Sequence, residues 1–133
     1  MTFWLIDLIG CHYEFHDVAI GDSFNISTPG YPNFYPDNFY CTWTFESNDT
    51  GNYALTFDEL TLLFLKTKNV DYFTLGRGNH TQIFQESHFI APGTTALIDD
   101  QRIWIRFESD EKFAFRGFSI NVQRIASQGK LYS

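Results

Sequence analysis

The four histidines are the side chains of this chain best suited to catalysis or metal binding, but their spacing predicts neither. His12 and His16 are four residues apart, a spacing that brings two imidazoles to one metal ion when the segment is helical. The residues around them, next to Cys11, do not follow a helical pattern, so we expect two exposed loop histidines. His80 and His88 are scattered, and the motifs of zinc proteases, serine hydrolases, phosphate-binding loops and dithiol redox proteins are missing. We therefore predict that the chain is not an enzyme.

Two cysteines and three N-glycosylation sequons indicate a protein that folds in an oxidising compartment. The sequons begin at Asn25, Asn48 and Asn79, and each has the form Asn-x-Ser/Thr. One sequon means little, but three in a β-rich chain with an even number of cysteines are typical of exported proteins. A disulfide between Cys11 and Cys41 would close a loop of about 30 residues and stabilise the fold by about 3–4 kcal/mol. We expect an extracellular protein.

Charge and composition exclude two classes of partner. The 133 residues carry a net charge of −7, whereas nucleic acids and anionic membrane surfaces require a basic face. Aromatic residues make up 19% of the chain, more than a disordered chain contains, so a packed fold is expected. The length fits one domain with its own core.

The elements that must position any functional residue are short strands. Residues 102–108 alternate strictly, with Ile103, Ile105 and Phe107 on one face and charged residues and Trp104 on the other, as in a half-buried strand. The same reasoning leaves 11–20, 60–65 and 80–90 unassigned and predicts strands at 3–9, 23–27, 41–46, 53–57, 70–75, 95–98, 102–108 and 117–125. About eight strands separated by turns predict an all-β, two-sheet antiparallel sandwich.

A proline-rich stretch at 28–43 leads into one of these strands. It reads Thr28-Pro-Gly-Tyr-Pro-Asn-Phe-Tyr-Pro, and Cys41-Thr-Trp43 follows after four intervening residues. This run resembles the signature of CUB domains, which are jelly-roll-like β-sandwiches. Its aromatic side chains could face a partner or pack the loop on the sandwich, and we expect the second for Tyr31, Phe34, Tyr35, Phe39 and Tyr40.

The resemblance implies a domain at 11–125, preceded by an extension or first strand at 1–10 and followed by a tail at 126–133. CUB domains are non-enzymatic, extracellular protein-interaction modules of larger secreted or membrane-anchored proteins, and they usually have a second disulfide that this chain lacks. Residues 1–10 are apolar but form neither a signal peptide nor a membrane span. We therefore expect a piece of a longer protein that binds an extracellular protein ligand.

The resemblance also implies a calcium site at one end of the sandwich. In a subset of CUB domains, one glutamate and two aspartates bind Ca²⁺ there. Asp71 and Asp110 match the two aspartates, but Leu63 occupies the position of the glutamate. The two remaining carboxylates should hold Ca²⁺ weakly or not at all, unless Glu59 or Glu111 reaches the site. Alternatively, both aspartates accept backbone N–H bonds at strand ends.

The same end of a CUB domain contacts ligand proteins, often through a lysine of the ligand. By resemblance, the partner-binding surface of this chain would include Leu63, Phe64, Asp71, Tyr72 and Asp110. The alternative function is a stand-alone secreted glycan-binding protein similar to spermadhesins. The negative net charge argues against heparin-like glycans, which bind Lys/Arg clusters.

Overall fold

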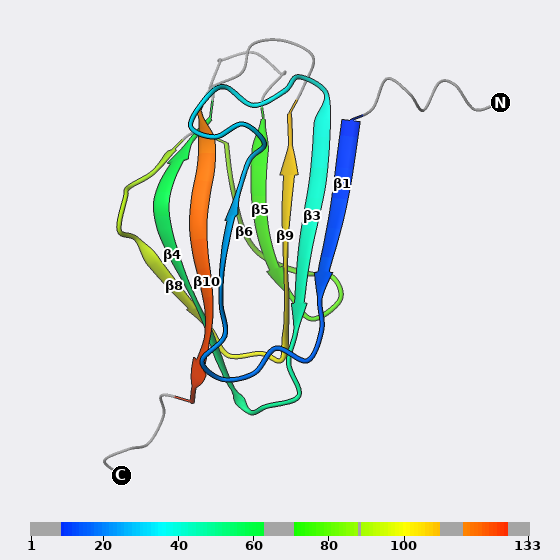
Figure 1. Cartoon of the computed structure of the whole chain (residues 1–133), viewed down its shortest axis with the longest axis vertical. Coiled ribbons are helices and arrows are strands. Elements are labelled where there is room, and N and C mark those ends of the chain that lie inside the picture. The colour runs from blue at the N-terminus through cyan, green and yellow to red at the C-terminus, as the bar shows by residue number, and fades with distance from the viewer. Residues whose placement is uncertain (1–8, 63–70, 88, 110–115, 128–133) are drawn as a thin grey trace, which may run out of the picture.

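The chain folds into two β-sheets packed face to face (Figure 1). This computed structural model describes residues 9–62, 71–87, 89–109 and 116–127. The first sheet contains, in spatial order, β1 (Ile9–Phe15), β3 (Phe39–Glu46), β9 (Arg102–Glu108), β5 (Tyr72–Arg77) and β6 (Thr81–Glu86). The second contains β2 (Ser23–Ser27), β10 (Gly117–Ala126), β4 (Gly51–Thr61) and β7 (Phe89–Ile90), and β8 (Thr95–Ile98) pairs with β4. The predicted all-β sandwich is confirmed.

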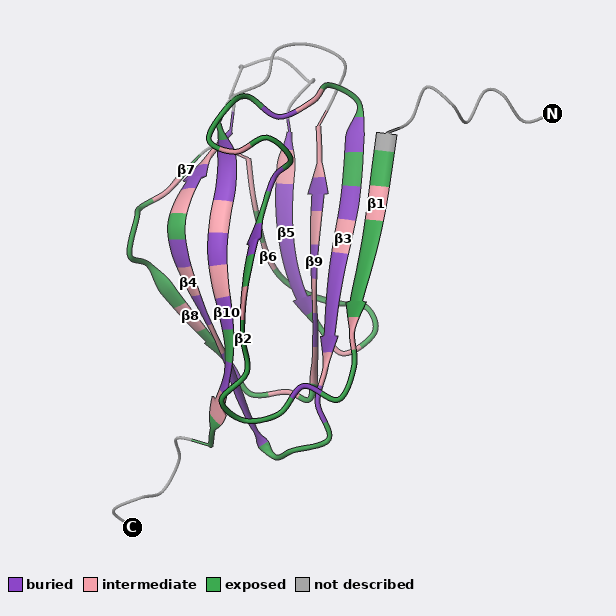
Figure 2. Ribbon diagram, viewed as in Figure 1, coloured by how far each residue is buried: buried purple, intermediate pink, exposed green. Residues whose placement is uncertain are grey.

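The core lies between the sheets, and buried residues are concentrated on the central strands β3, β4, β5, β9 and β10 (Figure 2). On β9, Ile103, Ile105 and Phe107 are fully buried, as the alternation predicted. Phe118 of β10 lies at the centre, where its ring centroid is 5.7 Å from Phe107 and 5.3 Å from Phe73 of β5. Such edge-to-face aromatic contacts join the two sheets and add to the free energy gained by burial.

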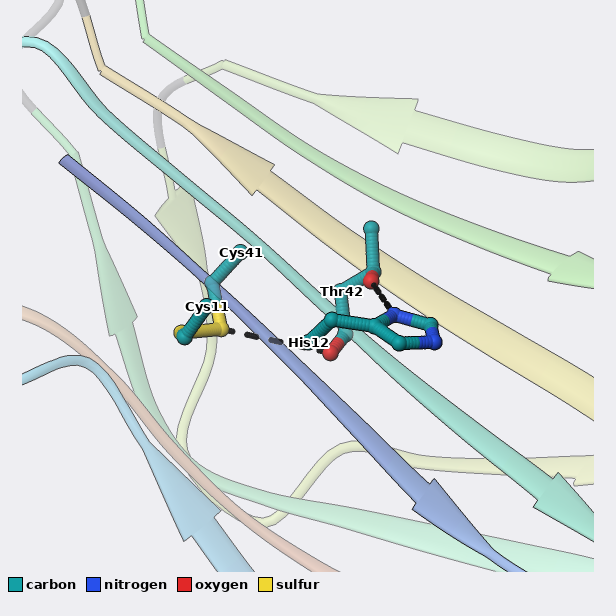
Figure 3. Close-up of a disulfide and its surroundings, with 4 residues drawn as sticks. All are labelled: Cys11, His12, Cys41 and Thr42. Carbon is teal, nitrogen blue, oxygen red and sulfur yellow. Dashed lines mark hydrogen bonds between the residues drawn. A yellow bond between two sulfur atoms is a disulfide. The ribbon is translucent and has the colours of Figure 1, made fainter. Parts of the chain in front are cut away.

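The edge strand β1 is the main difference from the expected elements. It pairs with β3 in parallel, and Cys11 lies opposite Cys41 in the register. The two cysteines form the predicted disulfide, with their Cα atoms 4.5 Å apart (Figure 3). His12 therefore lies on a strand rather than in a loop. The sequence did not reveal this strand because it is short and half exposed, so its apolar alternation is weak.

Two further segments extend the prediction. β4 continues to Thr61, and the apolar residues Leu60 and Leu62 are buried in the core. The unassigned segment 80–90 forms β6 and β7. Most of the strand predicted at 3–9 lies outside the described residues.

Among the described residues, there is no long apolar helix of the kind that crosses a membrane.

Candidate functional site

The proline-rich loop between β2 and β3 runs over the end of the sandwich at which β5 begins and β9 ends (Figure 1). Ser109, the residue after β9, fixes the loop there. Its hydroxyl donates to the carbonyl of Pro36 at 2.7 Å and accepts from the amide of Phe39 at 2.9 Å. Its own amide donates to the carbonyl of Phe39 at 2.8 Å. The loop therefore has a defined position relative to β9.

Asp71 lies at the same end, directly before β5, and only 2% of its surface is exposed. The hydroxyl of Tyr35, which comes from the proline-rich loop, donates a hydrogen bond to Asp71 Oδ2. The Tyr35 ring is buried and packs edge-on against Phe107, with 4.9 Å between ring centroids. A buried carboxylate requires such a partner because it has lost its water. Tyr35 thus belongs to the site that Asp71 marks, a contact the sequence alone did not indicate.

The strand register brings the segments of both predicted aspartates together. Tyr72 lies opposite Glu108 in the β5–β9 ladder, so Asp71 and Ser109 leave neighbouring strands at one end. Asp110 follows Ser109 in the sequence but lies outside the described residues, as do Leu63 and Phe64. Tyr72 itself is half-buried. The roles predicted for these five residues in metal and partner binding stay predictions.

Glu59, considered above as a substitute ligand, is already engaged. Its carboxylate accepts two hydrogen bonds from the Arg116 guanidinium, at 2.7 and 2.8 Å. The hydroxyls of Tyr31 and Thr61 donate to it at 2.5 and 3.1 Å. These bonds, those of Arg116 first, lower the pKa of Glu59 to about 2. Glu59 therefore links β4 to the proline-rich loop and to the residue before β10.

The described residues do not by themselves form a calcium site. Ca²⁺ takes six to eight oxygen ligands, several of them from carboxylates. At this end of the described structure Asp71 supplies one carboxylate, and no group of three His, Cys, Asp or Glu side chains is placed to hold a metal ion. A complete site would need Asp110 and backbone oxygens in addition.

A second polar arrangement, on the outer face of the first sheet, was missed at the sequence level. His12 Nε2 and His16 Nε2 lie 2.6 and 2.9 Å from the two carboxylate oxygens of Glu14. His16 Nδ1 lies 2.9 Å from Glu46, whose other oxygen accepts from Arg102 at 2.7 Å. The bond to Glu14 first, and that to Glu46 second, raise the pKa of His16. The sequence did contain a signal for this arrangement. His12, Glu14 and His16 are at positions i, i+2 and i+4, and such residues share one face of an extended chain.

The asparagines of the three sequons, Asn25, Asn48 and Asn79, are all exposed. Their glycosylation stays a prediction.

The aromatic residues of the proline-rich loop differ in burial. Tyr35 and Phe39 pack into the core as expected, whereas Phe34 and Tyr40 are 63% and 37% exposed. The packing interpretation is therefore confirmed for part of the group only.

Comparison with known proteins identifies the architecture. A family model described as CUB domain matches residues 11–122. Cubilin of Canis lupus familiaris is 27% identical over 120 residues, which cover 85% of this chain and 3% of cubilin. The full extracellular region of zebrafish Gpr126/Adgrg6 superposes with a TM-score of 0.74 at 22% identity, covering 88% of this chain and 15% of that chain. The MASP-1 CUB2 domain bound to Ca²⁺ superposes with a TM-score of 0.64 at 21% identity, covering 84% and 96%.

At 22% and 21% identity, these two solved structures show that the chain shares their fold. The chain spans 10% or less of the length of the curated relatives that it matches.

Proposed function

The chain belongs to the CUB domain family, and from this membership we propose that it is a non-enzymatic extracellular protein–protein interaction module, at 11–125, of a larger secreted or membrane-anchored protein. The observation that carries the proposal is the convergence of the proline-rich loop, Asp71 and Ser109 at one end of the sandwich. The Cys11–Cys41 disulfide supports the extracellular placement, because such bonds persist in oxidising compartments. The small share of each relative that the chain spans supports a module within a longer protein.

The partner would dock on this end and present a lysine or arginine to its carboxylates. In this proposal Asp71 and Asp110 would provide the negative charge, and Leu63, Phe64 and Tyr72 would provide apolar contacts. Asp71 is held in place by Tyr35, whose hydroxyl donates to it. A pre-positioned carboxylate loses less side-chain entropy on binding than a free one, which favours its use in recognition.

Calcium enters the proposal through Asp71 and Asp110. When bound, the ion would neutralise both carboxylates and tie the segments after β9 and before β5 together. Because Leu63 replaces a carboxylate in the family pattern, binding would be weak, with a dissociation constant of about 10⁻³ M, in the range of extracellular calcium modules.

Thermal melting in a Ca²⁺ titration tests the calcium part. A dissociation constant of about 1 mM and 5 mM free Ca²⁺ would raise Tm by about 3–6 °C. Asp71→Asn should abolish the rise. The matched control is Asp58→Asn, because Asp58 is exposed on β4 and, among the described residues, accepts one long bond, from Ser119 at 3.3 Å. An unchanged wild-type Tm up to 10 mM would remove calcium from the proposal.

A binding screen tests the interaction part. The full chain, made bivalent by fusion to an antibody Fc fragment, is applied to a panel of purified extracellular ectodomains with and without 2 mM Ca²⁺. We expect at least one partner whose binding is lost with Asp71→Asn and kept with Asp58→Asn. Binding that Asp71→Asn leaves intact would place the interaction surface elsewhere on the domain.

A further inference from the structure

The outer face of the first sheet contains a shallow groove next to the hairpin between β5 and β6. Its volume is about 290 Å³, at the low end of ligand pockets and suited to one small ring. Trp104 and Arg106 of β9 form one wall, and Asn79, His80 and Gln82 of the hairpin region form another. The groove thus combines an aromatic surface with several polar side chains.

Gly76 is what allows Trp104 to take its place in the groove. A Cβ atom at Gly76 would lie 2.0 Å from indole carbons of Trp104, so any other residue would displace the ring. The indole therefore lies directly over β5, the strand that leads into the hairpin. The Arg106 guanidinium lies 5.3 Å from the ring centroid and borders it on β9.

The hairpin that carries Asn79 is held against β9. The Gly78 amide donates to the Arg102 carbonyl at 2.9 Å, and Arg102 Nε donates to the Gly78 carbonyl at 3.0 Å. These two bonds fix the residue before Asn79. Asn79 is exposed at the groove and starts the sequon Asn79-His80-Thr81.

The other two sequons lie outside this groove, and their amides are already engaged. Asn48 Nδ2 donates to Asp17 at 3.0 Å, and Asn25 Oδ1 accepts from Asn121 at 2.9 Å. Within the part of the chain that the structure describes, no hydrogen bond is made by the Asn79 side chain. Asn79 is thus the sequon whose attached sugar would have a surface of the protein beside it.

The groove also offers polar side chains to a sugar. His80 and Gln82 of the hairpin region are exposed and line the groove together with Asn79. Arg106 lines it as well, although its Nε atom, like Trp104 Nε1, is buried and not reachable from the groove. The hydroxyl and acetamido groups of a sugar form hydrogen bonds with side chains of this kind.

We propose that this groove holds the first N-acetylglucosamine of a glycan attached to Asn79, with the apolar face of the sugar ring on Trp104. The attachment is made during export from a lipid pyrophosphate-linked oligosaccharide. The bond from sugar C1 to the pyrophosphate oxygen breaks, a bond from C1 to Asn79 Nδ2 forms, and the amide proton leaves with the pyrophosphate. The inference rests on the extracellular placement proposed above, and it assigns the Asn79 glycan a structural role.

The test compares two conservative variants of the sequon. The full chain is secreted from mammalian cells, and its glycans are trimmed to a single N-acetylglucosamine per site. Thr81→Ser keeps the sequon and Thr81→Ala removes it, while both remove the Cγ2 methyl group of the same exposed side chain of β6. Glycopeptide mass spectrometry should find Asn79 occupied in the wild type and in Thr81→Ser only. The Tm of Thr81→Ala should be about 2–6 °C lower than that of Thr81→Ser.

Two further measurements assign the effect to the groove. In a Trp104→Leu background, the Tm difference between the two Thr81 variants should disappear. Should that variant not fold, NMR of the wild-type glycoprotein decides, because the indole ring current should move the proton resonances of the Asn79-linked sugar away from their free-sugar positions.

The inference is overturned by an unoccupied Asn79 in exported protein, by equal Tm values of the two Thr81 variants, or by free-sugar resonances. These results leave the proposed function standing. Two free thiols in exported protein would instead contradict the extracellular placement itself. A further outcome is that protein lacking the Asn79 glycan binds free N-acetylglucosamine in the groove. That result would make the groove a site for a free ligand and not for the protein's own glycan, and it would also overturn the inference.

Discussion

Arg124 has an unusual environment for a charged residue. It occupies an inward position of β10 and is fully buried. Its guanidinium donates to the backbone carbonyls of Asp49 and Asp100 and lies 4.4 Å from the ring centroid of Tyr53. Burial raises the pKa of Tyr53 to about 12. Arg124 thereby joins two loops at the end of the sandwich opposite the candidate site.

Replacement of Arg124 should be among the most destabilising single changes outside the apolar core. Arg124→Met retains most of the apolar stem but leaves two carbonyls without their donor, so we expect the free energy of unfolding to fall by about 2–4 kcal/mol. Urea denaturation measures this. Arg77→Met, at an exposed end of β5, is the control and should change stability by less than about 0.5 kcal/mol. A loss below 1 kcal/mol for Arg124→Met would contradict this account.

The pKa of Glu59 predicts a pH dependence of stability. In the folded state the hydrogen bonds from Arg116 hold this pKa at about 2, below the ordinary value of 4.5. The stabilisation is therefore present above pH 4.5 and is lost as the pH falls toward 2. Glu59→Gln should reduce the slope of unfolding free energy against pH in this range, and Arg116→Gln should do the same. A wild-type slope in both variants would show that the pair does not contribute.

Among the elements, β1 depends most on a single covalent bond. It is an edge strand that pairs with one neighbour, β3, and much of its surface is exposed (Figure 2). The Cys11–Cys41 disulfide attaches it to β3 across a sequence separation of 30 residues. Closing a loop of this length restricts the unfolded chain.

Removal of the disulfide should destabilise the whole domain. Cys11→Ala combined with Cys41→Ala should lower the free energy of unfolding by about 3–4 kcal/mol, from loop-closure entropy. Urea denaturation of oxidised wild type and of the double variant gives the difference. Wild type unfolded in the presence of a thiol reductant should match the double variant. A large difference in unfolding free energy between reduced wild type and the double variant would mean that the loss of packing at the two Ala positions dominates, and not the loss of the crosslink.

At the scale of the whole molecule, three of the arginines that reach the described surface are paired with glutamates. Arg102, Arg106 and Arg116 each lie within ion-pair distance of a glutamate, at 2.7, 3.1 and 2.7 Å. The chain carries a net charge of −7. A sulfated glycan would therefore have to break these pairs and approach a negative protein.

We expect the chain to flow through a heparin column at 150 mM NaCl. Repulsion by the net negative charge acts over about 8 Å at this ionic strength, and no unpaired arginine cluster on the described surface compensates for it. Lysozyme, a basic protein, serves as the retained control. Retention of the chain above 150 mM NaCl would favour the alternative in which it is a glycan-binding protein.

The sequence by itself determined the strands with strict alternation and the family. Residues 102–108 and 117–125 were predicted almost to their ends, because side chains of a strand alternate between two faces and this pattern is local. The run Thr28–Trp43 marked the CUB domain, and the two cysteines marked the disulfide. Asp71 was singled out by its match to the family pattern, not by any local physical signal.

Only the tertiary structure decided which residues meet. The parallel pairing of β1 with β3, the bond from Tyr35 to Asp71, and the contact of Trp104 with Gly76 join residues far apart in the sequence. Glu59 and Arg116 are 57 residues apart. Such contacts follow from the order of strands in each sheet, which depends on the packing of the whole core and leaves no pattern in any single segment.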